Sequence, residues 1–295
     1  MLDFQWTRHS FGNLFATEYR ATPPNAFDGF CVTAPKDARL PGGGGNQICG
    51  YSDLNPKYLN ETPNNFVTAA SNFGNITDLY TGFDVSLTGR FGNGGQSSGG
   101  MSTGRERTDY CAIAGVAQIG TNTDTTAGKI FLDNYTGNSI NNSGRTATGY
   151  PSALYCSVTP PYQPDWKALV SYPVPLWGLN ASATWQNRAG PQILANQLVA
   201  ALDTTLGRPP SSAALSASLM APATQYEDRL NQVDLRVAKS VKVGSRGRLQ
   251  GTFSVFNLFN ANSILQENYQ YGPSWLLPTL ILQGRLIKFG AQLDF

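Results

Sequence analysis

Apolar residues recur at every second position in eight separate stretches of this chain. The clearest stretch is residues 287–295, where Ile287, Phe289, Ala291, Leu293 and Phe295 alternate with polar residues or glycine. The other seven are residues 2–10, 80–91, 96–110, 165–172, 179–186, 232–243 and 248–260, of which 96–110 has the weakest pattern. A period of two is typical of a β-strand with one apolar face. The pattern therefore predicts an all-β protein with about eight long strands.

Two stretches depart from this pattern. Residues Gln192–Leu202 have helical spacing and would form about three turns in a connecting region. Gln283 and Arg285 would fall in the apolar phase of the last strand. We expect a β-bulge or the lipid headgroup layer to accommodate them.

The connections between the predicted strands alternate in length. Three are short, at residues 92–95, 173–178 and 244–247. The other four contain about sixty, fifty, thirty-five and twenty residues in chain order, which is long for a compact domain. In an antiparallel meander, alternate connections emerge at the same end of the sheet. Short turns at one end and long loops at the other are typical of an outer-membrane β-barrel.

The alternation places apolar side chains on one face of the sheet and polar ones on the other. A membrane barrel would turn the apolar set to lipid, and a soluble β-sandwich would bury it, so the alternation alone does not separate the two. Strand length favours the membrane, because several stretches reach ten or more residues. Aromatic residues near the strand ends would form an interfacial girdle. They are Tyr80, Phe91, Trp166, Tyr172, Trp177, Trp185 and Phe259.

Composition narrows the class of protein further. Charged residues make up 14% of the chain, below the ~25% of typical soluble proteins. The net charge is +2, with Lys and Arg scattered, which argues against a nucleic-acid partner. The mean hydropathy is −0.25, and no apolar run approaches the ~20 residues of a spanning helix. The chain opens on an alternating stretch, without the pattern of a signal peptide.

The four cysteines, Cys31, Cys49, Cys111 and Cys156, lie in or beside the long loops. Of the three possible pairings we expect the local one, Cys31 with Cys49 and Cys111 with Cys156, in an oxidising compartment. Zinc is the competing interpretation, but no two cysteines have the close spacing of a zinc site. His9 is the single histidine and lies at the end of the first strand. We therefore expect no enzyme activity and no metal or cofactor.

Several segments resemble one family of membrane proteins. "NQVDLRVAKS" (231–240), "FSVFNLFN" (253–260) and "RLIKFGAQLDF" (285–295) are similar, in this order, to the closing strands of TonB-dependent outer-membrane receptors. Residues 30–56 and 164–191 also resemble barrel segments of these receptors. The type most similar is the Oar-like one, which carries an N-terminal carboxypeptidase-regulatory-like domain. The resemblance spans essentially the whole chain.

The resemblance implies a barrel of about twenty-two strands, a plug domain and a periplasmic segment for TonB. This chain has about eight strands and neither a plug domain nor a signal peptide, so residues 1–295 are expected to be the C-terminal segment of a transmembrane barrel in the bacterial outer membrane. The implied partners are outer-membrane lipid, the β-barrel assembly machinery, the remainder of the receptor barrel and its plug. TonB would act only through the missing N-terminal part.

In this family the terminal aromatic strand is what the assembly machinery recognises, which assigns that role to the alternating apolar residues of 287–295. The expected function is a segment of a transporter that contributes barrel wall and extracellular loops for substrate uptake. The sequence does not indicate the substrate or the residues that bind it. Two alternatives stay open. One is a self-contained, closed eight-stranded outer-membrane barrel with an anchoring or adhesive role, and the other is a secreted β-sandwich that binds glycans.

Overall fold

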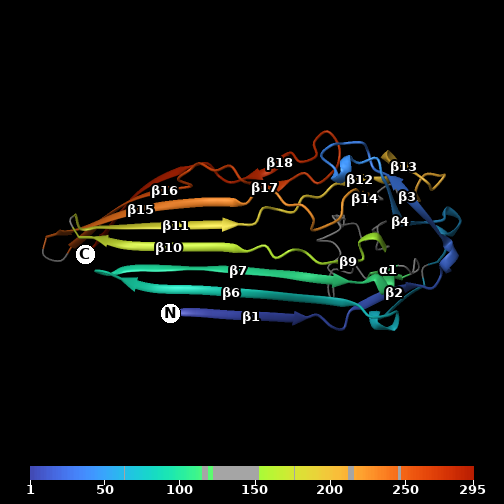
Figure 1. The fold of residues 1–295 in the computed structure, drawn as a ribbon, viewed down its shortest axis with the longest axis horizontal. Coiled ribbons are helices and arrows are strands. Elements are labelled where there is room, and N and C mark those ends of the chain that lie inside the picture. The colour runs from blue at the N-terminus through green and yellow to red at the C-terminus, as the bar shows by residue number, and fades with distance from the viewer. Residues whose placement is uncertain (63, 115–118, 122–152, 176, 212–215, 245–246) are drawn as a thin grey trace.

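The protein is an antiparallel all-β structure with one large sheet and four small ones. The computed structural model describes residues 1–62, 64–114, 119–121, 153–175, 177–211, 216–244 and 247–295. Figure 1 shows the large sheet as an elongated body whose strands lie side by side along the long axis. The long connections gather at one end of this body.

Eight strands form the large sheet in meander order. They are β1 (Leu2–Ser10), β6 (Thr77–Phe91), β7 (Gly95–Asp109), β10 (Asp165–Val174), β11 (Leu179–Arg188), β15 (Leu230–Val243), β16 (Gly247–Phe256) and β19 (Leu286–Asp294). Each pairs antiparallel with the one before it in this series, and β9 (Ser157–Val158) adds to the end of β7. The predicted meander is therefore confirmed. The weakest stretch, 96–110, forms β7, which is as long as β6 at 15 residues.

The three short turns lie together at the end of the sheet opposite the long connections (Figure 1). Gly178 and Gly244 have φ angles of 58° and 65° in two of these turns. A positive φ is accessible to glycine without the steric cost that a Cβ atom imposes. Glycine therefore lets the chain reverse direction within a few residues, so the connections at this end of the sheet are short.

The large sheet is open. Its two edges are β1 and β19, which do not pair with each other, so the closed eight-stranded barrel is not what forms. The β-sandwich interpretation is also wrong for the described residues, because no second sheet of comparable size faces the first. Within the described part of the chain, no helix is long and apolar enough to cross a membrane.

The four long connections contain short elements of their own, and we call them together the cap. Its strands are β2 (Phe15–Tyr19), β3 (Phe27–Thr33), β4 (Gln47–Leu54), β5 (Asn65–Ala69), β8 (Ile119–Thr121), β12 (Asn196–Leu198), β13 (Asp203–Thr204), β14 (Ser216–Ser218), β17 (Ile264–Glu267) and β18 (Pro278–Ile281). Its helices are α1 (Cys111–Ala114) and the 3₁₀ turns Pro24–Ala26, Pro41–Gly43, Pro56–Tyr58, Ala70–Asn72, Ala153–Tyr155 and Val199–Ala201. The small sheets have the orders β13–β3–β4, β5–β2–β8, β12–β14 and β17–β18.

The helix predicted over Gln192–Leu202 is not present. The segment forms β12 and a 3₁₀ turn instead, and β12 pairs with β14. Ala195 and Val199 are fully buried in the cap, and Leu194 is nearly so. Burial on several sides at once, together with backbone pairing to β14, outweighs a weak local helical preference.

The hydrophobic core lies in the cap and not under the large sheet. One cluster packs Phe30, Val32 and Ile48 of β3 and β4 against Val199 and Trp275, and a smaller one surrounds Ala16, Ala70, Tyr110 and Ile113. Among the described hydrophobic residues of the eight long strands, only Leu230 is buried, at the first position of β15. Among the described residues, the large sheet therefore has no hydrophobic core on either of its faces.

Candidate functional site

Strand register places the apolar positions of all eight long strands on one surface, which we call the apolar face. Leu2 pairs with Leu87, Val170 with Ala183, and Phe253 with Phe289. Because alternate residues share a face, each such pair fixes the orientation of its strands. The apolar face comprises Leu2, Phe4, Trp6, Phe83, Val85, Leu87, Met101, Trp166, Ala168, Val170, Ala181, Ala183, Trp185, Val233, Leu235, Val237, Phe253, Val255, Ile287, Phe289, Ala291 and Leu293.

Most of the large side chains of the apolar face are exposed. Phe4 and Phe289 have 63% and 77% of their surface accessible. Monomeric soluble proteins rarely expose a contiguous apolar patch larger than a few hundred Å². An exposed apolar surface that runs across eight strands therefore marks an interaction surface.

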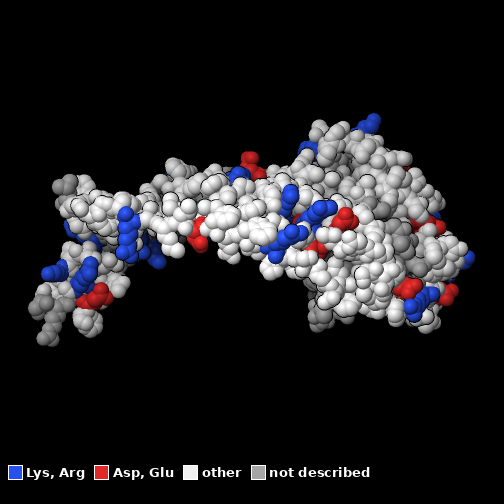
Figure 2. Space-filling model, turned by 60° about the horizontal axis from the view of Figure 1, so that its bottom comes forward, with Lys and Arg blue, Asp and Glu red and all other residues white. Residues whose placement is uncertain are grey.

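Charged side chains on the apolar face occur only at its borders within the described residues. By register, Arg8, Arg105 and Arg107 lie toward the cap and Lys239 toward the turns. On the face seen in Figure 2, charged groups gather near the turn end and near the cap, with few between them. Long basic side chains at such borders can extend their charge into water while their stems cover apolar surface. The apolar face is thus a band with charged margins.

Most of the aromatic residues expected in a girdle lie at the margins of this band. At the turn end, the rings of Phe91 and Tyr172 stack with centroids 6.0 Å apart, and Trp177 is exposed in the turn itself. Toward the cap, the indole Nε1 of Trp185 donates to Asn231. The expectation that Tyr80 belongs to the girdle is wrong. The strand register pairs Tyr80 with His9 and Glu106, which lie on the opposite face of the sheet.

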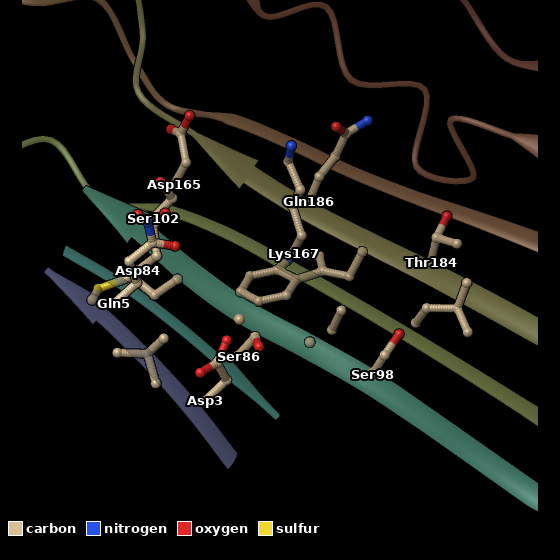
Figure 3. A pocket seen from close by; sticks show the side chains of 17 residues that line it. Asp3, Gln5, Asp84, Ser86, Ser98, Ser102, Asp165, Lys167, Thr184 and Gln186 are labelled. Atoms are coloured by element: carbon tan, nitrogen blue, oxygen red, sulfur yellow. The ribbon is translucent and has the colours of Figure 1, made fainter. Parts of the chain in front are cut away.

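The opposite surface of the sheet is polar and carries a shallow hollow of about 660 Å³. Figure 3 shows the polar side chains around it, carried by β1, β6, β7, β10 and β11. They are Asp3, Gln5, Asp84, Ser86, Ser98, Ser102, Asp165, Lys167, Thr184 and Gln186. Gly100 lines this hollow, and a Cβ atom there would overlap the carbonyl oxygen of Val85. The close approach of β6 and β7 therefore requires glycine at this position.

Side chains of the polar face form hydrogen bonds to one another both between strands and along them. Gln186 Nε2 donates to Gln232 Oε1 at 3.0 Å, and Gln232 Nε2 donates to Asp234 Oδ1 at 2.9 Å. Asp234 also accepts from the backbone N–H of Asn257 and from the Thr184 hydroxyl. Such a network suits a surface in contact with water or with polar protein, because each group remains hydrogen-bonded.

The strand proposed to carry the assembly signal is the edge strand β19. Its apolar positions pair with those of β16, and the rings of Phe253 and Phe289 lie 5.2 Å apart. Phe295 follows the strand and is fully exposed. Gln283 and Arg285 precede the first residue of β19, so the expected bulge is not needed. The backbone N–H of Arg285 donates to Asn260 Oδ1 at 2.8 Å.

Two disulfides brace the cap, with the local pairing expected from the sequence. Cys31–Cys49 joins β3 to β4, and Cys111–Cys156 joins α1 to the segment before β9. The backbone N–H of Tyr110 also donates to the Cys156 carbonyl at 2.9 Å. In the chain-entropy model, closing loops of these lengths stabilises a fold by about 3–4 kcal/mol each.

Arg208 joins two distant parts of the cap in a charged network that the sequence does not reveal. Its guanidinium donates to Asp28 at 2.6 Å and also to Asp53, which is only 4% exposed. The hydroxyl of Ser211 donates to Asp53 Oδ1 at 2.8 Å. Every oxygen of the buried carboxylate therefore has a donor, which is the condition for burying a charge.

A second pair of acidic groups has no such partner. Glu267 at the end of β17 is 3% exposed, and the carboxyl of Glu227 lies beside it. Burial, reinforced by the neighbouring charge of Glu227, raises the pKa of Glu267 to about 7. Within the described residues, no cluster of three or more His, Cys, Asp or Glu side chains is arranged to hold a metal ion.

Comparisons with known proteins do not assign this chain to a family. No family model, curated protein or solved structure matches it. The features that bear on function are therefore the two faces of the large sheet and the organisation of the cap.

Proposed function

We propose that this chain forms part of the wall of a bacterial outer-membrane β-barrel of the TonB-dependent-receptor type, together with extracellular loops that meet the transported substrate. The observation that carries the proposal is the apolar face, a largely exposed band across eight strands whose charged residues, among those described, lie only at its margins. Lipid is the environment in which such a band is stable, because outer-membrane barrels turn an apolar band with aromatic margins outward.

The open sheet supports a partial barrel. Backbone groups in lipid must be paired, so an open edge is not stable within the hydrocarbon region. The outer edges of β1 and β19 are unpaired in the described structure. Further strands of the receptor barrel would pair with these edges, and a plug would pack against the polar face. Contact with TonB would be made by those other parts of the receptor.

The cap supports an extracellular position for the long connections. It has its own hydrophobic core and two disulfides. Disulfides persist in oxidising compartments outside the cytoplasm. A pre-formed cap at the outer end of the wall would present a stable surface to substrate. The role is in transport, with outer-membrane lipid and the barrel assembly machinery as partners, and not in catalysis.

The proposal is tested by placing one charge on either face of the same strand. Ala183 lies on the apolar face at mid-strand of β11, and its neighbour Ser182 lies on the polar face. We expect Ala183→Arg to disfavour insertion into phosphatidylcholine vesicles by about 2–4 kcal/mol, because an arginine would enter the middle of the bilayer. Ser182→Arg should insert nearly as well as the native chain.

The measurement is vesicle flotation followed by protease protection of the full chain. Equal insertion of the two variants would contradict the assignment of the faces. A native chain that stays monomeric in water without detergent or lipid would contradict the membrane location itself.

A further inference from the structure

Two glutamates from different connections meet inside the cap. Glu267 ends β17 in the connection between β16 and β19, and it pairs with Pro278 of β18. Glu227 lies in the connection between β11 and β15, where its backbone N–H donates to the Pro191 carbonyl at 2.9 Å. Their carboxyl groups lie within hydrogen-bonding reach of each other. The pair therefore joins two connections that are separate in the chain.

The carboxyl group of Glu267 is buried without a positively charged partner among the described residues. Both of its oxygens are inaccessible, and apart from the neighbouring carboxyl of Glu227 they have no hydrogen-bond partner. None of the ion pairs among the described residues includes Glu267 or Glu227. An isolated buried carboxylate is strongly unfavourable, and a second carboxylate beside it adds repulsion. By contrast, the other well-buried carboxylate of the cap, Asp53, has Arg208 as its partner.

We propose that Glu227 and Glu267 bind a calcium ion that ties the β11–β15 connection to the β16–β19 connection. Calcium takes six to eight oxygen ligands in flexible geometry, including carboxylates, backbone carbonyls and water. Two carboxylates would supply the charge, and carbonyls or water would complete the shell. Magnesium is a poorer occupant, because it demands near-ideal octahedral geometry and dehydrates reluctantly.

The calcium ion would link the two connections where the cap meets the large sheet. Just beyond Glu267, the Tyr269 carbonyl accepts from the backbone N–H of Asn196 at 2.9 Å, and the Tyr271 N–H donates back to the Asn196 carbonyl at 2.7 Å. Glu227 lies three residues before β15 begins at Leu230. An ion between the glutamates would hold this part of the cap against the outer end of β15. With two carboxylates, we expect an affinity of about 10⁻⁴–10⁻³ M, the range of extracellular calcium modules.

The test is calcium binding by the full chain in detergent, measured by isothermal titration with calcium chloride and, separately, with magnesium chloride. We expect saturable calcium binding and slower trypsin cleavage at Arg229 when calcium is present. Glu267→Gln and Glu227→Gln should each weaken calcium binding at least tenfold, since each removes one charged ligand without changing side-chain size. Glu61→Gln is the matched control, because Glu61 is an exposed carboxylate elsewhere in the cap.

Three results would overturn the proposal. The first is no saturable calcium uptake by the native chain up to about 10 mM, well above the affinity of extracellular modules. The second is unchanged binding in either glutamine variant. The third is magnesium binding as tight as calcium binding. None of these bears on the membrane location, so the calcium site and the proposed function can fail separately.

Discussion

Arg208 illustrates how one side chain can organise the cap. It lies 180 residues from Asp28 and 155 from Asp53 in the sequence, yet it bonds to both. The buried Asp53 depends on this guanidinium and on Ser211 for its stability. Removing one partner of a buried charge pair is costly, because the other charge remains buried and uncompensated.

We expect Arg208→Ala to lower the free energy of unfolding of the cap by about 2 kcal/mol, the loss of hydrogen bonds to charged groups. Arg20→Ala is the control, because Arg20 forms an exposed pair with Glu18 and exposed pairs contribute less than about 1 kcal/mol. Urea unfolding followed by limited proteolysis of the cap measures both. Equal losses in the two variants would show that Arg208 is only a surface charge.

At the scale of elements, the pairing of β6 with β7 depends on an aromatic ring placed over glycine. The ring of Tyr80 covers Gly82 on its own strand and Gly104 on the neighbouring one. A Cβ atom at Gly104 would overlap the Tyr80 hydroxyl. The sequence places Tyr80 at a strand end, but only the register shows that its ring fills the space left by two glycines.

Gly104→Ala should therefore destabilise the sheet by about 1–3 kcal/mol, the usual cost of overpacking, because Tyr80 must leave its position. Gly251→Ala in β16 is the matched control, since nothing lies within 4 Å of a Cβ atom there. The control should change stability by less than about 0.5 kcal/mol. Urea titration of the vesicle-inserted chain compares the two, and equal effects would exclude a packing role for Tyr80.

At the scale of the whole molecule, hydrophobic residues are distributed in two different ways. The cap buries its apolar side chains, whereas the large sheet displays them on one face. The same chain thus combines a part with a buried hydrophobic core and a part whose apolar side chains are largely exposed. This division follows the two ends of the large sheet, because the long connections at one end form the cap and the short turns at the other end contain only a few residues each.

Deletion of Phe295 tests the proposed assembly role of the last strand. We expect it to reduce the correctly folded, membrane-inserted fraction several-fold in cells, because the terminal aromatic group would no longer extend the apolar alternation of β19. Asp294→Asn is the control, since it keeps the aromatic residue and alters only a polar-face charge. Heat-dependent gel mobility of outer-membrane fractions measures assembly. Normal assembly without Phe295 would remove the support for an assembly signal here.

Most of the large sheet was predictable because its pattern is local. A strand with one exposed apolar face must alternate, and the alternation over residues 287–295 or 80–91 needs no partner to be recognised. The small sheets of the cap were missed, because strands such as β12 have only three residues. The local spacing over Gln192–Leu202 predicted a helix, and burial in the cap core produced a strand instead.

The sequence by itself determined the all-β class, the eight long strands and most of the side chains on each face, because each depends on residues close together in the chain. Only the tertiary structure decided that the sheet is open, that the core lies in the cap, that Arg208 meets Asp53, and that Glu227 meets Glu267. These depend on contacts between distant segments, and no periodic pattern encodes which distant segments meet.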